Sequence, residues 1–248
     1  MTRPRNGRSV AQVARDLASI GSGFYARGWV LGTSGNFSAV LSRRPIRLAI
    51  TASAVDKGTL TARHVLEVDE RGQIVRPPKH RATSAKRRGA ASRESPVTSD
   101  SRGLGPSAET RLHLEIVRRR DANAVLHTHS VWSTMLSDVH FDRGGLELSG
   151  YEMLKGLRGV VTHEQREWIP IVENDQNMDR LAESIGDALD RFPACHAVLL
   201  RRHGMYTWGA SLGEAARHVE ILEFLLETIG RTATFRGSEV SHGAAQNS

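Results

Sequence analysis

The sequence is poor in cysteine and contains no long hydrophobic run. Cys195 is the only cysteine in 248 residues, which excludes an internal disulfide and a zinc site built from several cysteines. No run approaches about 18 apolar residues, so a membrane-spanning helix is excluded. No apolar stretch follows the basic first residues, so a secretory signal is not expected. These absences favour a soluble protein in a reducing compartment, the cytoplasm.

The composition is that of a globular protein. Hydrophobic residues make up 39% of the chain, and the 23 glycines bring the apolar share to an ordinary value, which excludes a mostly disordered chain. The length of 248 residues corresponds to one or two domains and allows a sizeable core.

The positive charge is concentrated in one segment. The net charge is +7, and residues 76–103 contribute +6 through eight basic and two acidic side chains. This segment is aperiodic and nearly free of large aliphatic residues, which predicts a disordered, solvated insertion. The alternative is a nucleic-acid-binding arm. It is less favoured, because no aromatic residue is available for base stacking.

Helices are predicted where apolar residues recur at steps of three and four. The final helix is expected to begin at Ser211, with Glu214 in a capping box, and to stop at Gly230. The polar residues after it predict a frayed tail over 237–248. The other predicted helices cover residues 9–27, 107–119 with Ser107 as N-cap, 130–136, 151–157 and 178–189.

Strands are predicted where short apolar or alternating runs are bounded by turn residues. The two most apolar runs, AVLHT at 124–128 and AVLL at 197–200, are expected to be buried. The remaining strands are expected at 37–41, 47–51 and 65–68, with a turn at 69–72.

Histidines stand at the ends of both apolar strands. His127 and His129 are two residues apart, which places both imidazoles on one side of an extended chain. If the strands are neighbours, His203 lies beside this pair, and three imidazoles with an open position are typical of a catalytic zinc site. The alternative is that these histidines are structural. The remaining histidines are interpreted as surface or structural: His64, His80, His113, His140, His163, His196, His218 and His242.

Carboxylates and small polar loops could complete such a site. Glu109 and Glu152 could act as acid or base beside a metal, although position alone favours ordinary solvated carboxylates. The segments 32–36 and 51–58 carry exposed amides, hydroxyls and a lysine, which a phosphate site needs. Neither matches a known phosphate-loop pattern, so each segment alone is better explained as an ordinary turn.

The order of several motifs resembles the methylthioribulose-1-phosphate dehydratases of the class II aldolase/adducin superfamily. HTHS and a later HG mark the superfamily, and three longer motifs point to the dehydratase branch. The resemblance covers about residues 17–227, apart from 76–103. The motifs are GWVLGTSGNFS, TASAVDKG, PSAET, HTHS, GYEMLKG, PIVEN and RRHGMYTWG.

The resemblance implies an α/β fold with three αβα layers around a mainly antiparallel sheet. It implies a single domain over residues 1–248 and a homotetramer, with no membrane partner. The implied reaction is a hydro-lyase step of methionine salvage, which converts 5-methylthioribulose 1-phosphate to 2,3-diketo-5-methylthiopentyl 1-phosphate. The alternatives are a zinc-dependent sugar-phosphate aldolase or pentulose-phosphate 4-epimerase of the same superfamily, and a non-catalytic adducin-like binding module.

The resemblance also assigns roles residue by residue. Glu152 is implied as the catalytic acid/base, and Glu109 lines the substrate site. Ala54 stands where the family usually has glycine, which is expected to tighten its loop. One zinc ion (Zn2+) per subunit is implied, with ligands His127, His129 and His203; the phosphate cradle is Ser34, Gly35, Asn36, Ser53 and Lys57.

Overall fold

The computed structural model describes residues 9–76 and 104–245, without the side chains of Arg76 and of residues 236–245. Nine strands form one mixed sheet in the order β4-β3-β2-β1-β5-β9-β8-β7-β6, and only the β7–β8 pair is parallel. The strands are β1 Asn36–Arg43, β2 Ile46–Thr51, β3 Val65–Asp69, β4 Ile74–Arg76, β5 Ala124–Thr128, β6 Gly145–Leu148, β7 Glu167–Val172, β8 Ala197–Leu200 and β9 Gly204–Gly209.

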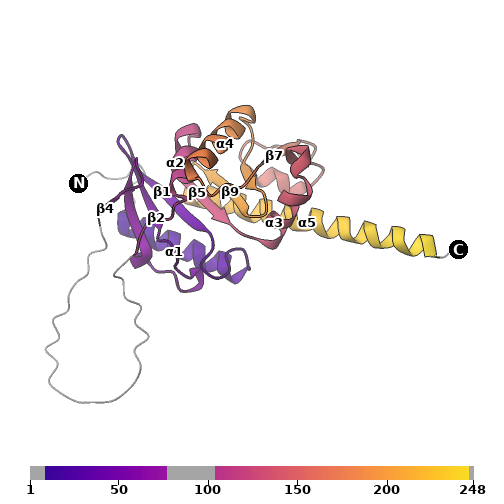
Figure 1. The fold of residues 1–248 in the computed structure, drawn as a ribbon, viewed down its shortest axis with the longest axis horizontal. Coiled ribbons are helices and arrows are strands. Elements are labelled where there is room, and N and C mark those ends of the chain that lie inside the picture. Colours follow the sequence, from indigo (N-terminus) through magenta and orange to yellow (C-terminus); the bar gives the residue numbers. More distant parts are fainter. Residues whose placement is uncertain (1–8, 77–103, 246–248) are drawn as a thin grey trace, which may run out of the picture.

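Helices cover both faces of the sheet, as Figure 1 shows. Alternate residues of β5 belong to different core clusters: Val125 packs with α2 and α4, and Leu126 packs with α1 and α5. This period of two confirms the predicted three-layer αβα arrangement. The helices are α1 Val10–Ala26, α2 Thr110–Arg119, α3 Val131–Val139, α4 Met178–Arg191 and α5 Leu212–Ala245, and the 3-10 turns are η1 Lys57–Thr59, η2 Ala62–His64, η3 Phe141–Arg143 and η4 Glu152–Gly156.

Most predicted elements are present within a few residues of their expected bounds. Ser9 caps α1 by accepting from the Gln12 amide, and Ser211 accepts from the Glu214 amide at the start of α5. The segment predicted as a helix at 151–157 is the short 3-10 turn η4. The strands β6, β7 and β9 had not been predicted.

The final helix does not stop at Gly230, where the prediction was wrong. Helical backbone continues to Ala245, so residues 237–245 of the segment predicted to fray are helical. Gly230 has a packing role instead. A Cβ at this position would lie 2.3 Å from the Trp132 ring of α3, so glycine lets the indole contact the helix backbone.

Residues 77–103, which carry most of the predicted basic insertion, lie outside the described residues, and so do 246–248. Among the described residues, no helix combines the length and apolar character needed to cross a membrane.

Candidate functional site

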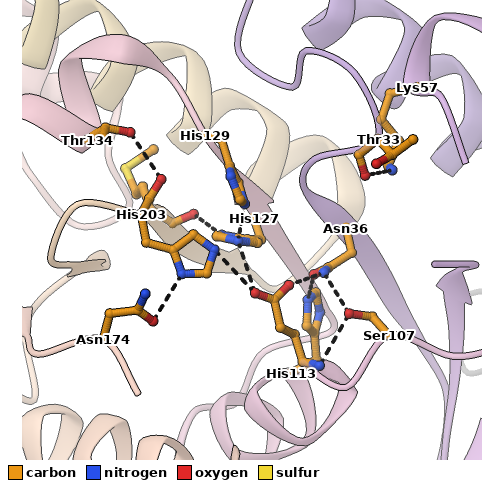
Figure 2. Close-up of polar contacts among 12 residues, drawn as sticks. Thr33, Asn36, Lys57, Ser107, His113, His127, His129, Thr134, Asn174 and His203 are labelled. Carbon is orange, nitrogen blue, oxygen red and sulfur yellow. Dashed lines mark hydrogen bonds and ion pairs between the residues drawn. The ribbon is translucent and has the colours of Figure 1, made fainter. Parts of the chain in front are cut away.

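Three histidines converge at one end of the central strands (Figure 2). His127 lies in β5, His129 follows it, and His203 lies in the turn between β8 and β9. One ring nitrogen from each lies within 4.8 Å of the others. The assumption that β5 and β8 are neighbours was wrong, because β9 lies between them. The tight β8–β9 connection nevertheless brings His203 to the pair.

Hydrogen bonds orient two of the three imidazoles. Nδ1 of His127 lies 3.0 Å from the Met205 carbonyl oxygen, and Nδ1 of His203 lies 3.3 Å from Oδ1 of Asn174. Both partners are acceptors, so these nitrogens carry the proton and each Nε2 keeps a free lone pair. Nε2 of His127 lies 2.7 Å from Nε2 of His129.

Burial keeps the rings of His127 and His129 neutral. It lowers the pKa of His129 to about 4 and that of His127 well below its ordinary value. Neutral imidazoles with converging lone pairs are the donor set that zinc and its neighbours prefer. The arrangement therefore fits a divalent transition metal held by His127, His129 and His203.

Close backbone packing supports the triad from two sides. The Tyr206 ring of β9 stacks on His127 at a centroid distance of 3.9 Å and an angle of 8°. A Cβ at Gly204 would lie 2.1 Å from the Thr128 carbonyl oxygen, and one at Gly35 would lie 2.6 Å from that of His127. The two glycines allow neighbouring chain segments to lie directly against the ligand strand.

Glu109 lies next to the triad. Its Oε1 is 3.3 Å from Nε2 of His203 and 3.8 Å from that of His127, and its Oε2 accepts a 2.5 Å hydrogen bond from Nδ2 of Asn36. Burial opposes ionisation, but the pKa of Glu109 lies below its usual range, and the hydrogen bond that the Asn36 amide donates favours the ionised form. An ionised carboxylate thus faces the metal position.

Ser107 is not the N-cap of α2, contrary to the prediction. The helix begins at Thr110, and Glu109 takes the cap position without a side-chain cap bond. Ser107 Oγ instead accepts from the Glu109 amide at 3.2 Å. The Glu109 carboxylate is thereby free to turn toward Asn36 and the histidines.

Lys57 joins the two loops predicted to bind phosphate. Its side chain is buried, and Nζ donates to the carbonyl oxygens of Thr33 at 3.0 Å and Val55 at 2.7 Å. Burial lowers its pKa to about 8. Of the other predicted cradle residues, Gly35 and Asn36 are buried, Ser34 is half-buried and Ser53 is exposed.

Glu152, the predicted catalytic residue, lies in solvent in the single chain. Its side chain is 71% exposed and pairs with Lys155 Nζ at 2.6 Å and His163 Nδ1 at 3.6 Å. Lys155 lowers the pKa of Glu152. Its described polar contacts thus do not reach the histidine triad.

Two residues of the site were missed. His113, interpreted as surface or structural, is fully buried and contacts Asn36, which in turn contacts Glu109. Its spacing of four residues from Glu109 places both on one face of α2, a signal that could have found it. Tyr206, which stacks on His127, was assigned no role from the sequence although it lies within the motif RRHGMYTWG.

Comparisons with known proteins agree with this geometry. The profile of the family described as Class II Aldolase and Adducin N-terminal domain matches residues 15–229. A methylthioribulose-1-phosphate dehydratase from Methylococcus capsulatus is 40% identical over 86% of this chain and 91% of its own. One from Persephonella marina is 35% identical over 86% of both chains.

Solved structures show the same fold. An L-fuculose-1-phosphate aldolase from Thermus thermophilus has a TM-score of 0.66 at 24% identity, covering 92% of this chain and 99% of its own. A sugar-phosphate aldolase from Thermotoga maritima has a TM-score of 0.59 at 18% identity, covering 90% and 95%.

Proposed function

The chain belongs to the class II aldolase and adducin family, and we propose that it dehydrates 5-methylthioribulose 1-phosphate to 2,3-diketo-5-methylthiopentyl 1-phosphate in methionine salvage. The observation that carries the proposal is the 35–40% identity, over most of both chains, to relatives bearing that dehydratase name. The assembled triad of His127, His129 and His203 adds the machinery of an enzyme.

The proposed cofactor is one zinc ion per subunit, held by the triad. The Nδ1 atoms of His127 and His203 are each bonded to an oxygen, which leaves Nε2 for the metal and supports this choice. When bound, zinc supplies Lewis-acid polarisation of a substrate carbonyl oxygen.

The remaining chemistry is proton transfer by the chain's own carboxylates. We assign Glu152 as the group that removes the C3 proton and then, once protonated, passes that proton to the departing C4 hydroxyl, which leaves as water. The resulting enol tautomerises to the diketone. The GYEMLKG motif supports this role, although the side chain is exposed in the single chain. Glu109 lines the substrate position beside the triad.

The loops joined by Lys57 are the proposed phosphate cradle. Its ammonium has three hydrogens, and two are engaged by Thr33 and Val55, which leaves one for a phosphate oxygen. The proposed assembly is a homotetramer, which the family resemblance supports. The proposed location is the cytoplasm, which the single cysteine supports.

Two other functions are less well supported. A zinc-dependent aldolase or 4-epimerase would use the same triad, but the two aldolase structures compared above share 24% and 18% identity with this chain, which shows only the fold. A non-catalytic adducin-like module has no need of three converging histidines.

The deciding experiment supplies the purified, zinc-loaded protein with methylthioribulose 1-phosphate and measures diketone formation. Glu152→Gln should lower kcat by about 10²–10⁴-fold, because glutamine cannot accept the C3 proton. Zinc content should remain at one per chain. Glu109→Gln is the matched comparison, assayed for exchange of the C3 proton with deuterium. Wild-type exchange in Glu152→Gln, together with lost exchange in Glu109→Gln, would reverse the two roles.

A further inference from the structure

A buried chain of hydrogen bonds leads from Ser38 in β1 to the carboxylate beside the triad, and Figure 2 shows its part around His113 and Asn36. Oγ of Ser38 lies 2.8 Å from Nδ1 of His113. Nε2 of His113 contacts Oδ1 of Asn36, and Nδ2 of Asn36 donates to Oε2 of Glu109. Ser38 and His113 are completely buried, and Asn36 is 5% exposed.

The chemistry of the groups sets the direction of every bond in the chain. An ionised carboxylate only accepts, so Asn36 must present its amide nitrogen to Glu109 and its oxygen to His113. The oxygen only accepts, so Nε2 of His113 carries a hydrogen. Burial keeps the ring neutral by lowering its pKa to about 4, so Nδ1 accepts from the Ser38 hydroxyl.

We propose that His113 is a positioning residue: by donating from Nε2 it holds the Asn36 amide in one orientation, and the amide holds the Glu109 carboxylate beside the three histidines. This inference rests on the proposed function, because Glu109 belongs to that site. Without the donor, Oδ1 of Asn36 is left without a hydrogen-bond partner in a buried place, which is unfavourable. The amide is then held on one side only and fixes the Glu109 carboxylate less firmly.

A second contact ties His113 to the same site. Its ring lies edge-on to Tyr206, with centroids 5.7 Å apart, and Tyr206 stacks on His127. The Ser107 hydroxyl lies 3.4 Å from Nδ2 of Asn36, so the amide has further partners on the Glu109 side only. On the His113 side, the imidazole is therefore the described partner that holds the amide oxygen.

The test compares His113→Gln with His113→Met in the full-length, zinc-loaded protein. Both side chains resemble histidine in length, but only glutamine can donate to Asn36. His113→Met should lower kcat by about 10- to 100-fold with KM and zinc content nearly unchanged, as is typical when a residue supporting an active-site group is lost. His113→Gln should recover most of this activity. A methionine variant with wild-type kcat, or a glutamine variant as impaired as a well-folded methionine variant, overturns the proposal.

A measurement on the wild-type protein covers the case in which a variant fails to fold. The nitrogen chemical shifts of His113 distinguish the two neutral tautomers, and the proposal requires the form protonated at Nε2. A proton on Nδ1 overturns it. This readout needs no activity, so absence of diketone from every protein would reject the proposed function and leave the tautomer to decide the role of His113.

Discussion

Gly204 offers the sharpest test of how the triad is supported, through the substitution Gly204→Ala. This glycine begins β9 directly after His203, where the strand turns to run beside β5. Its missing side chain faces the ligand strand. An added Cβ would lie 2.1 Å from the Thr128 carbonyl oxygen and 3.3 Å from Cε1 of His127.

The expected cost follows from that overlap. A carbon and a carbonyl oxygen need about 3.3 Å, so β9 and β5 must separate by about 1 Å at this point. Overpacking of this kind costs about 1–3 kcal/mol, and weakening a ladder hydrogen bond adds about 1 kcal/mol. The unfolding free energy should fall by about 3 kcal/mol. His127 should also move, because Nδ1 is bonded to Met205 in the displaced strand.

Urea denaturation of the metal-free protein and zinc analysis of the loaded protein check both consequences. The matched control is Gly213→Ala in the first turn of α5, where the nearest heavy atom to an added Cβ is Ser211 Oγ at 4.0 Å. Alanine at position 213 should raise the unfolding free energy by up to about 1 kcal/mol, because alanine favours the helix more than glycine does. A Gly204→Ala protein with wild-type stability and full zinc content would refute the packing argument.

Three further outcomes are expected. His129→Ala should lose zinc and activity together, whereas His140→Ala, which lies outside the triad, should keep both; full zinc occupancy in the first variant contradicts the ligand assignment. Ala54→Gly should raise the unfolding free energy by about 1 kcal/mol in urea titrations, because Ala54 has φ +57°, and a loss of stability contradicts this. The buried Glu223 carboxyl accepts from Thr128, and burial raises its pKa to about 7. The folded state therefore binds the Glu223 proton more tightly than the unfolded state does. The unfolding free energy of the metal-free wild-type protein should fall by up to about 3 kcal/mol as pH rises from about 4.5 to 7, whereas that of Glu223→Gln should not. Equal pH slopes of the unfolding free energy in the two proteins contradict this.

Local patterns predicted most of the elements because each was carried by its own residues. The apolar period of α1 and the serine before it define both its face and its start. The strands β7 and β9 were not predicted from the sequence, because proline and glycine usually indicate turns. β7 contains Pro170, and β9 is bounded by Gly204 and Gly209. Gly230 was misread for the same reason, since only the tertiary structure shows Trp132 against it.

The triad was predictable from histidines at strand ends, but the reason for its convergence was not. His203 reaches the pair because β9 pairs with both β5 and β8, a fact of sheet topology that no local pattern encodes. The role of His113 was hidden in the same way. Its partners Ser38 and Asn36 lie 75 and 77 residues away in the chain, so its spacing of four residues from Glu109 is the local feature that distinguishes it from a core histidine.

Lys57 combines a predicted role in phosphate binding with a structural role. The sequence indicated only that its positive charge could bind phosphate, whereas the structure shows a buried ammonium bonded to carbonyl oxygens of two loops, one of them 24 residues away. Burying an ammonium is costly unless its hydrogens are bonded, and the two carbonyls offset that cost. The same bonds set the spacing of the loops around the remaining hydrogen. A charge held in this way is oriented before any anion arrives, which an exposed lysine at the same place in the sequence would not be.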